Sequence, residues 1–235
     1  MSALLLDIGN TRVKWGVLLD GNINQTGNTP LQDFPPQLPK QIDSAIACNV
    51  AGTDIAGKVA AAVESQCNAK TTFVQSTMSA AGVTNSYKHA ASLGVDRWVA
   101  LIGARAATDK ACIVVDAGTA ITIDALDANG QHLGGQILPG LRLMAEALDL
   151  STSDLPDVSG RLTDRVSGEP YFANATVDAI AAGILSAANG AIENAMRALQ
   201  AEERDADLLL TGGDAPLLKQ VLARASELRE HLVLE

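Results

Sequence analysis

The sequence is poor in aromatic residues and in cysteine, and it lacks long apolar runs. Phe, Trp and Tyr make up 3% of the 235 residues, and the three cysteines, Cys48, Cys67 and Cys112, are scattered. A length of 235 residues excludes a disulfide-stapled miniprotein. Because the cysteines are odd in number and include no C-x-x-C pair, we expect reduced, mostly buried thiols and a cytoplasmic protein. The aliphatic runs Ala3–Leu6 and Ala111–Val115 are far shorter than the ~20 residues of a membrane-spanning helix. We therefore expect no membrane span.

Positive charge is also scarce. The chain has 17 Lys and Arg against 27 Asp and Glu, which gives a net charge of −10. A surface that neutralises many phosphates needs clustered basic residues, so this balance argues against a nucleic acid partner. An acidic protein that binds an anion such as ATP must instead concentrate a few cations, recruit metal ions or use backbone N–H groups. The P-loop sequence G-x-x-x-x-G-K-[ST] is absent, which excludes a P-loop enzyme.

The N-terminal part predicts a β-hairpin with a polar tip. The strands Ala3–Leu6 and Val13–Leu19 flank a turn at Asp7–Arg12. The same pattern returns in the middle of the chain, where two further apolar runs flank a turn at Asp116–Thr119. A repeat with so long a period indicates duplicated domains rather than a solenoid.

Each predicted hairpin is followed by more strand and then by helices, which is typical of two mixed α/β domains. We place the domains at residues 1–109 and 110–235. Apolar periodicity between Val177 and Met196 predicts a helix with Thr176 as its N-cap, and a second helix is expected at Pro216–Arg229.

The two hairpin tips carry the residues best suited to chemistry. In Asp7-Ile8-Gly9-Asn10-Thr11 and in Asp116-Ala117-Gly118-Thr119, a carboxylate and several backbone N–H groups would surround one point, an arrangement that suits a phosphate with its cation. One copy alone is more typical of an ordinary hairpin turn, in which Asp and Gly supply the turn geometry. Two copies in corresponding places favour a phosphate-binding cleft, to which Thr211-Gly212-Gly213 would add backbone for an adenosine.

These three segments resemble the first phosphate, second phosphate and adenosine motifs of the acetate and sugar kinase, heat-shock chaperone and actin superfamily. Three more segments resemble motifs of the type III pantothenate kinases: Leu93–Trp98 their G-x-D-R motif, Gly134–Gly140 their G-G-x-I-x-P-G segment, and Asn174–Ile180 their late threonine motif. The resemblance covers nearly the whole chain in the right order. It implies an α/β fold of two tandem actin-like (ribonuclease H-like) domains, each a mixed β-sheet flanked by helices.

The resemblance also implies an activity, ATP-dependent phosphorylation of pantothenate on its 4′-hydroxyl, the first step of coenzyme A biosynthesis. It further implies a homodimer, Mg²⁺ and a monovalent cation, either K⁺ or NH4⁺. An alternative is an ATP-binding regulatory or accessory protein of the same family without kinase activity. An exopolyphosphatase-like hydrolase is disfavoured, because a polyanionic substrate calls for a basic channel that the sequence does not offer.

By resemblance, Asp96 is the catalytic residue. An ordinary aspartate, with a pKa of about 3.9, is a weak base for an alcohol, so we expect Asp96 to orient the hydroxyl and to accept its proton late. Asp96 and Arg97 also fit a solvated first helical turn, Tyr87 fits a half-buried core position, and Thr176 fits a helix cap as well as a residue that reaches the neighbouring subunit. The residues expected to bind pantothenate are Tyr87, Gly94, Val95, Asp96, Arg97 and Thr176.

The nucleotide is expected at the three glycine-containing turns. Asp7 is the candidate for holding Mg²⁺ through water, and the resemblance associates Asp116 with the monovalent cation. Arg12 and Lys14 would assist the triphosphate, or lie on solvated strand ends. The three histidines match no ligand spacing and are given no role. The residues expected to bind ATP are Asp7, Ile8, Gly9, Asn10, Thr11, Arg12, Val13, Lys14, Gly118, Thr119, Thr211, Gly212 and Gly213.

Overall fold

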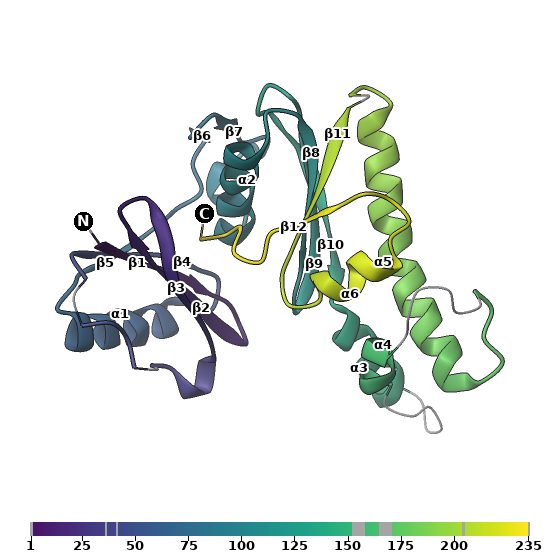
Figure 1. The fold of residues 1–235 in the computed structure, drawn as a ribbon, viewed down its shortest axis with the longest axis horizontal. Helices are drawn as coiled ribbons and strands as arrows, with labels where there is room; N and C mark the ends of the chain where they lie inside the picture. Colours follow the sequence, from purple (N-terminus) through teal and green to yellow (C-terminus); the bar gives the residue numbers. More distant parts are fainter. Residues whose placement is uncertain are drawn as a thin grey trace. The chain divides into compact units, whose positions relative to one another are not determined.

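The computed structural model describes residues 2–35, 37–40, 42–151, 158–164, 171–203 and 205–234 (Figure 1). The chain divides into two compact units. The first contains the residues up to Ala80, Tyr87–Gly103 and the residues from Leu232 onward, and the second contains Ala81–Ser86 and Ala104–His231. The division between the units falls inside one helix, α2 (Val95–Ala107). The domain boundary expected between residues 109 and 110 lies close to it and stays a prediction.

The first unit is built on a five-stranded mixed sheet. Strands β3, β2 and β1 are antiparallel neighbours, and β4 and β5 continue the sheet parallel to β1. Alternating apolar residues of β1 and β2 pack with the buried face of helix α1 into one core. In sheet order the strands are β3 (Asn22–Pro30), β2 (Arg12–Leu19), β1 (Ser2–Ile8), β4 (Ser44–Asn49) and β5 (Thr71–Phe73), with helices η1 (Leu31–Asp33), α1 (Thr53–Cys67) and η2 (Ala90–Ser92) and the short strand β6 (Ser79–Ala80).

The second unit repeats this sheet in the same order and with the same strand directions. Strands β10, β9 and β8 are antiparallel neighbours, and β11 and β12 run parallel to β8. The duplication expected from the two hairpins is therefore confirmed at the level of topology. In sheet order the strands are β10 (His132–Pro139), β9 (Ala120–Leu126), β8 (Ala111–Ala117), β11 (Ala206–Thr211) and β12 (Glu227–Leu228), with the short strand β7 (Val83–Thr84).

Helix α5 (Thr176–Gln200) covers the second sheet (Figure 1). Its buried residues recur at three- and four-residue spacing from Ala181 to Leu199 and pack against β8, β9 and β11, as the apolar periodicity predicts. The other helices of the unit are α3 (Leu141–Ser151), α4 (Ser159–Asp164) and α6 (Ala215–Val221).

Two expectations about helix ends are wrong. The N-cap of α5 is Ala175, and no side chain caps that end, so Thr176 is the first helical residue. The helix expected at Pro216–Arg229 ends at Val221, and the chain then forms β12, which pairs with β11. Helical propensity was overridden by the sheet, whose parallel edge offers backbone hydrogen bonds to an added strand.

The tryptophans lie in the first unit. Trp15 in β2 and Trp98 in α2 are both buried. All three cysteines are free and buried, as expected. Of the helices described, none combines the length and hydropathy that crossing a membrane requires.

Candidate active site

Asp7 lies inside β1 rather than in the turn where the sequence pattern had placed it. It faces Lys14 across the antiparallel pair with β2 and Cys48 across the parallel pair with β4. The Cys48 thiol donates a hydrogen bond to Asp7 Oδ1 with a sulfur-to-oxygen distance of 3.3 Å. Asp7 is only 9% exposed, so its carboxylate is held in a fixed place at the end of the strand.

The electrostatic surroundings of Asp7 include a second carboxylate. Burial raises the pKa of Asp7, Lys14 and the Cys48 hydrogen bond lower it, and Asp96 raises it again. An effect of Asp96 on the Asp7 pKa means that the two carboxylates lie within electrostatic reach of each other, both in the first unit. The structure thus brings together two of the residues to which sequence analysis gave the main chemical roles.

Asp96 lies in the first turn of α2, where the helix N-terminus favours a negative charge. Its Oδ1 accepts a hydrogen bond of 2.7 Å from the backbone N–H of Arg97. Upstream, the Ser76 hydroxyl donates to the carbonyl of Leu93 at 2.8 Å, which anchors the segment that leads into the helix. The position of the Asp96 carboxylate is therefore set by local backbone contacts.

Arg97 is buried, with 6% of its surface exposed. One guanidinium nitrogen donates to the Tyr87 hydroxyl at 3.1 Å, and the guanidinium carbon lies 5.8 Å from the centre of the Tyr87 ring. The interpretation that places Arg97 on a solvated helix face is wrong. A buried guanidinium needs hydrogen-bond partners for its donors, and Tyr87 is one of them. The pair therefore places an ordered polar contact next to Asp96 in the sequence.

The first hairpin tip is open to solvent. Asn10, Thr11 and Arg12 are exposed, and the Gly9 N–H closes the turn on the carbonyl of Arg12 at 3.0 Å. The Arg12 guanidinium binds Asn28 of β3, with Nε to Oδ1 at 2.6 Å.

Ile8 and Val13 are fully buried in the core of the first unit. Of these two residues, only the backbone is available to a ligand.

The second hairpin places Asp116 in the corresponding position. Asp116 lies in β8 and faces Thr122 of β9 and Thr211 of β11. The turn is closed by the Gly118 N–H, which donates to the carbonyl of Ala120 at 3.0 Å. The neighbours of Asp116 in the sheet are thus two threonines, where the neighbours of Asp7 are a lysine and a cysteine.

Two glycines let other turns approach this second hairpin closely. Gly212 has φ +94°, and a Cβ there would overlap the carbonyl oxygen of Ala117 and Asp116 Oδ1. A Cβ on Gly140 would overlap the carbonyl oxygens of Gly118 and Thr119 in the second hairpin turn. The Gly140 N–H donates a hydrogen bond of 3.0 Å to the Thr119 carbonyl. The second hairpin, the end of β10 and the turn after β11 therefore converge in the second unit.

The oxygens at both hairpins suit hard cations. Mg²⁺ in nucleotide sites keeps several waters and takes one or two carboxylates together with phosphate oxygens, and Asp7 with Asp96 nearby offers such carboxylates. Asp116 Oδ1 and the Ala117 carbonyl, which both border Gly212, are the oxygen ligands that larger cations accept. Among the described residues, there is no cluster of three or more His, Cys, Asp or Glu side chains suited to a metal.

Sequence reasoning missed a buried polar network in the second unit. His132 is fully buried, and its Nε2 lies 2.9 Å from Asp124 Oδ1, while its Nδ1 lies 3.2 Å from the Ser86 hydroxyl. The signal in the sequence was Asp124 itself, an acidic residue within the apolar strand β9. A buried carboxylate requires a hydrogen-bond partner, so this residue pointed to a buried polar contact. Cys48 was also missed as the hydrogen-bond partner of Asp7.

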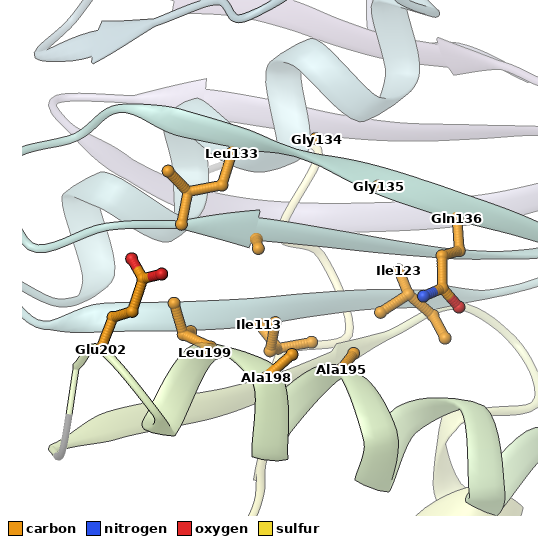
Figure 2. A pocket seen from close by; sticks show the side chains of 11 residues that line it. Ile113, Ile123, Leu133, Gly134, Gly135, Gln136, Ala195, Ala198, Leu199 and Glu202 are labelled. Atoms are coloured by element: carbon orange, nitrogen blue, oxygen red, sulfur yellow. The ribbon is translucent and has the colours of Figure 1, made fainter.

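A cavity of about 580 Å³ lies elsewhere in the second unit, between β8–β10 and the C-terminal half of α5. Figure 2 shows its apolar walls, including Leu133, Ile113 and Leu199, with the polar side chains of Glu202 and Gln136 toward opposite ends. None of the residues expected to bind ATP or pantothenate lines it among the described residues. This cavity is therefore separate from the candidate site.

The whole chain is similar to one family of known proteins. The family model described as "Type III pantothenate kinase" matches residues 3–198. A type III pantothenate kinase of Aromatoleum aromaticum is 41% identical over 99% of this chain and 94% of its own length. One of Methylobacillus flagellatus is 38% identical over 100% of this chain and 96% of its own length.

Solved structures show the same fold at lower identity. A conserved Campylobacter jejuni protein assigned to the Baf family of transcriptional activators aligns with a TM-score of 0.64 and 24% identity, over 98% of this chain and 92% of its own. The activator of 2-hydroxyisocaproyl-CoA dehydratase from Clostridium difficile, with bound ADPNP, aligns with a TM-score of 0.53 and 12% identity, over 100% and 92%. These likenesses confirm the actin-like fold with two tandem mixed sheets.

Proposed function

The chain belongs to the type III pantothenate kinase family, and on that premise we propose that it transfers the γ-phosphoryl group of ATP to the 4′-hydroxyl of pantothenate. The products are ADP and 4′-phosphopantothenate, and the reaction is the first step of coenzyme A biosynthesis. The acceptor oxygen forms the new bond to phosphorus, and the bond from phosphorus to the β–γ bridging oxygen breaks. The chain's own residues bind both substrates and handle the proton of the hydroxyl.

The observation that carries the proposal is the match to type III pantothenate kinases over nearly the whole chain, and the presence of Asp7 and Asp96 in the same unit supports it. Asp7 is the last residue but one of β1, which leads into the first phosphate turn, and Asp96 lies in the first turn of α2, which begins inside the G-x-D-R segment. A phosphoryl group held beside Asp7 would thus lie near an acceptor hydroxyl held by Asp96. Such pre-positioning accounts for most of the catalysis in phosphoryl transfer, where little covalent chemistry falls to the protein.

Asp96 is the catalytic residue in this proposal. It orients the pantothenate hydroxyl and takes its proton late, when the bond to phosphorus is largely formed. Arg97, whose guanidinium donates to the Tyr87 hydroxyl, binds polar groups of pantothenate in this proposal. Gly94 and Val95 form the wall of the pocket next to Asp96.

In this proposal the nucleotide is bound by the glycine-containing turns. The backbone from Asp7 to Lys14 and at Gly118 and Thr119 binds the phosphates, and Thr211 to Gly213 bind the adenosine. Mg²⁺, held by Asp7 through water, would neutralise charge on the phosphates when bound. Asp116 Oδ1 and the Ala117 carbonyl oxygen, which both border Gly212, favour Asp116 as the residue that holds K⁺ or NH4⁺.

We also propose a homodimer formed through the second unit. Ile137 of β10 is 64% exposed, and Phe172, just before α5, is 85% exposed and lies in edge-to-face contact with Tyr171 at 5.1 Å. Large apolar side chains this exposed are typical of an interface. Thr176, exposed at the start of α5 and not used as a cap, would then reach the partner's pantothenate pocket.

A cytoplasmic location is proposed from the three free, buried cysteines.

The test is ADP release with MgATP, with and without pantothenate and K⁺. We expect turnover that requires pantothenate and is stimulated by K⁺, and a loss of about 100-fold or more in kcat for Asp96→Asn. Asp54→Asn is the matched control, since Asp54 also lies in the first turn of a helix of the first unit but is exposed. ATP turnover that is indifferent to pantothenate would refute the proposal and leave a nucleotide-driven accessory protein or a hydrolase.

A further inference from the structure

The Cys48 thiol hydrogen-bonds the Asp7 carboxylate from a neighbouring strand. Cys48 lies near the end of β4, directly opposite Asp7 in the parallel pair with β1, and it is 4% exposed. Its Sγ lies 3.3 Å from Asp7 Oδ1. An ionised carboxylate can only accept, so the thiol is the donor of this hydrogen bond.

The second sheet has a position equivalent to that of Cys48, beside its own hairpin aspartate. Strand β11 occupies in the second sheet the place that β4 occupies in the first. The β11 residue opposite Asp116 is Thr211, which is buried like Cys48. Both units therefore place a small, buried residue with a neutral donor group beside the hairpin aspartate.

Lys14 occupies the other side of Asp7 and supplies positive charge. The thiol differs from the lysine because it is neutral and cannot cancel the carboxylate's charge. A neutral donor fixes the orientation of a carboxylate while leaving its charge and its remaining lone pairs for a cation. Lys14 of β2 thus supplies positive charge beside Asp7, and Cys48 of β4 fixes the orientation of its carboxylate.

We infer that Cys48 is a positioning residue of the nucleotide–metal site, whose thiol orients the Asp7 carboxylate toward the water shell of the bound divalent cation. This inference rests on the proposed function, because it takes Asp7 as the residue that holds that cation. Partners of this kind commonly change metal affinity by an order of magnitude when they are removed. A thiol is a weak donor, so a smaller effect is expected here.

The experiment measures Mn²⁺ binding by electron paramagnetic resonance in the presence of ADP and without pantothenate, so no turnover is involved. For Cys48→Ala we expect binding of Mn²⁺ that is weaker by about fivefold, the equivalent of one ordinary hydrogen bond. Cys48→Ser keeps a donor and should stay within about twofold of the unmodified protein. Cys67→Ala, which removes another buried thiol of the first unit, should leave Mn²⁺ binding unchanged.

Asp7→Asn separates a failure of this inference from a failure of the proposed function. If Asp7→Asn weakens Mn²⁺ binding but Cys48→Ala does not, the positioning role is refuted while the metal site stands. Equal weakening by the alanine and serine variants also refutes it, because loss of packing would then explain both. If Asp7→Asn has no effect, Asp7 does not hold the cation and the assignment of the metal site itself fails.

A measurement on the unmodified thiol covers the case in which Cys48→Ala does not fold. The S–H stretching band in the infrared shifts to lower frequency when the thiol donates a hydrogen bond. Replacing Asp7 by alanine should move the Cys48 band toward the frequency of a free thiol, with a Cys48→Ser sample used to assign it. A band that does not respond to Asp7→Ala refutes the inference.

Discussion

Replacing Gly212 by alanine tests the close packing of three turns in the second unit. The residue has φ +94°, and an added Cβ would overlap the Ala117 carbonyl and Asp116 Oδ1. The left-handed backbone costs an L-residue about 1–2 kcal/mol, and overpacking adds about 1–3 kcal/mol. We therefore expect Gly212→Ala to lower the free energy of unfolding by about 2–5 kcal/mol, and at roughly 2–4 °C per kcal/mol to lower Tm by about 10 °C.

Two other glycines of the same unit separate the two contributions. Gly134 has φ +111°, and no described atom lies within 4 Å of the place that a Cβ would take, so Gly134→Ala reports the backbone cost alone, about 1–2 kcal/mol. Gly213, next in sequence to Gly212, has similar free space among the described residues and no positive φ. Gly213→Ala should change stability by less than about 0.5 kcal/mol.

The assay is differential scanning calorimetry of the four proteins, together with titration of ADP. Gly212→Ala should also weaken ADP binding, because the overlap displaces either the Asp116 carboxylate or the turn itself. If Gly212→Ala and Gly134→Ala have the same melting temperature, the steric contribution is absent. The reasoning that places Gly212 against Asp116 would then be refuted.

Three further variants test individual side chains. Asp7→Asn should raise Tm at neutral pH even as it weakens cation binding, because burial raises the pKa of Asp7 above 3.8 and the charged carboxylate therefore destabilises the folded protein. The increase in Tm should shrink as the pH falls toward 3.8, where the carboxylate becomes protonated in both the folded and the unfolded protein, and melting curves at several pH values check this. Arg97→Lys should raise KM for pantothenate about tenfold or more and affect kcat less, because an ammonium group cannot reproduce the guanidinium's bond to Tyr87 and its other donors; an unchanged KM in steady-state kinetics would contradict this. His132→Ala should destabilise the protein by about 3 kcal/mol in urea unfolding, since it leaves buried Asp124 without this partner; a loss below about 1 kcal/mol would show that water replaces the imidazole.

The fold was largely predictable because short-range sequence patterns specify its strands, turns and longest helix. Each hairpin has strands of alternating or continuous apolar residues on either side of a turn rich in Asp, Gly and Thr, and each forms as expected. The periodicity that predicts α5 was equally reliable, because a long amphipathic helix is specified by many residues at once. The repeated strand order then follows from the repeat in sequence.

The detail of the site was less predictable because it depends on register between distant segments. The Cys48 thiol reaches Asp7 only because β1 and β4 pair in parallel with these two residues opposite each other. The burial of Arg97 against Tyr87 likewise depends on the path of the chain before α2. The true end of α6 was missed because the edge of a sheet, rather than local propensity, determines where that helix stops.

The placement of the two tryptophans gives the protein an internal spectroscopic label. Trp15 and Trp98 are the two tryptophans of the chain, and both are buried in the first unit. Selectively excited tryptophan emission therefore reports chiefly on the melting of that unit, while circular dichroism follows the backbone of both. Comparing the two curves from one sample reveals whether the halves of this duplicated chain melt as a single cooperative block or one after the other.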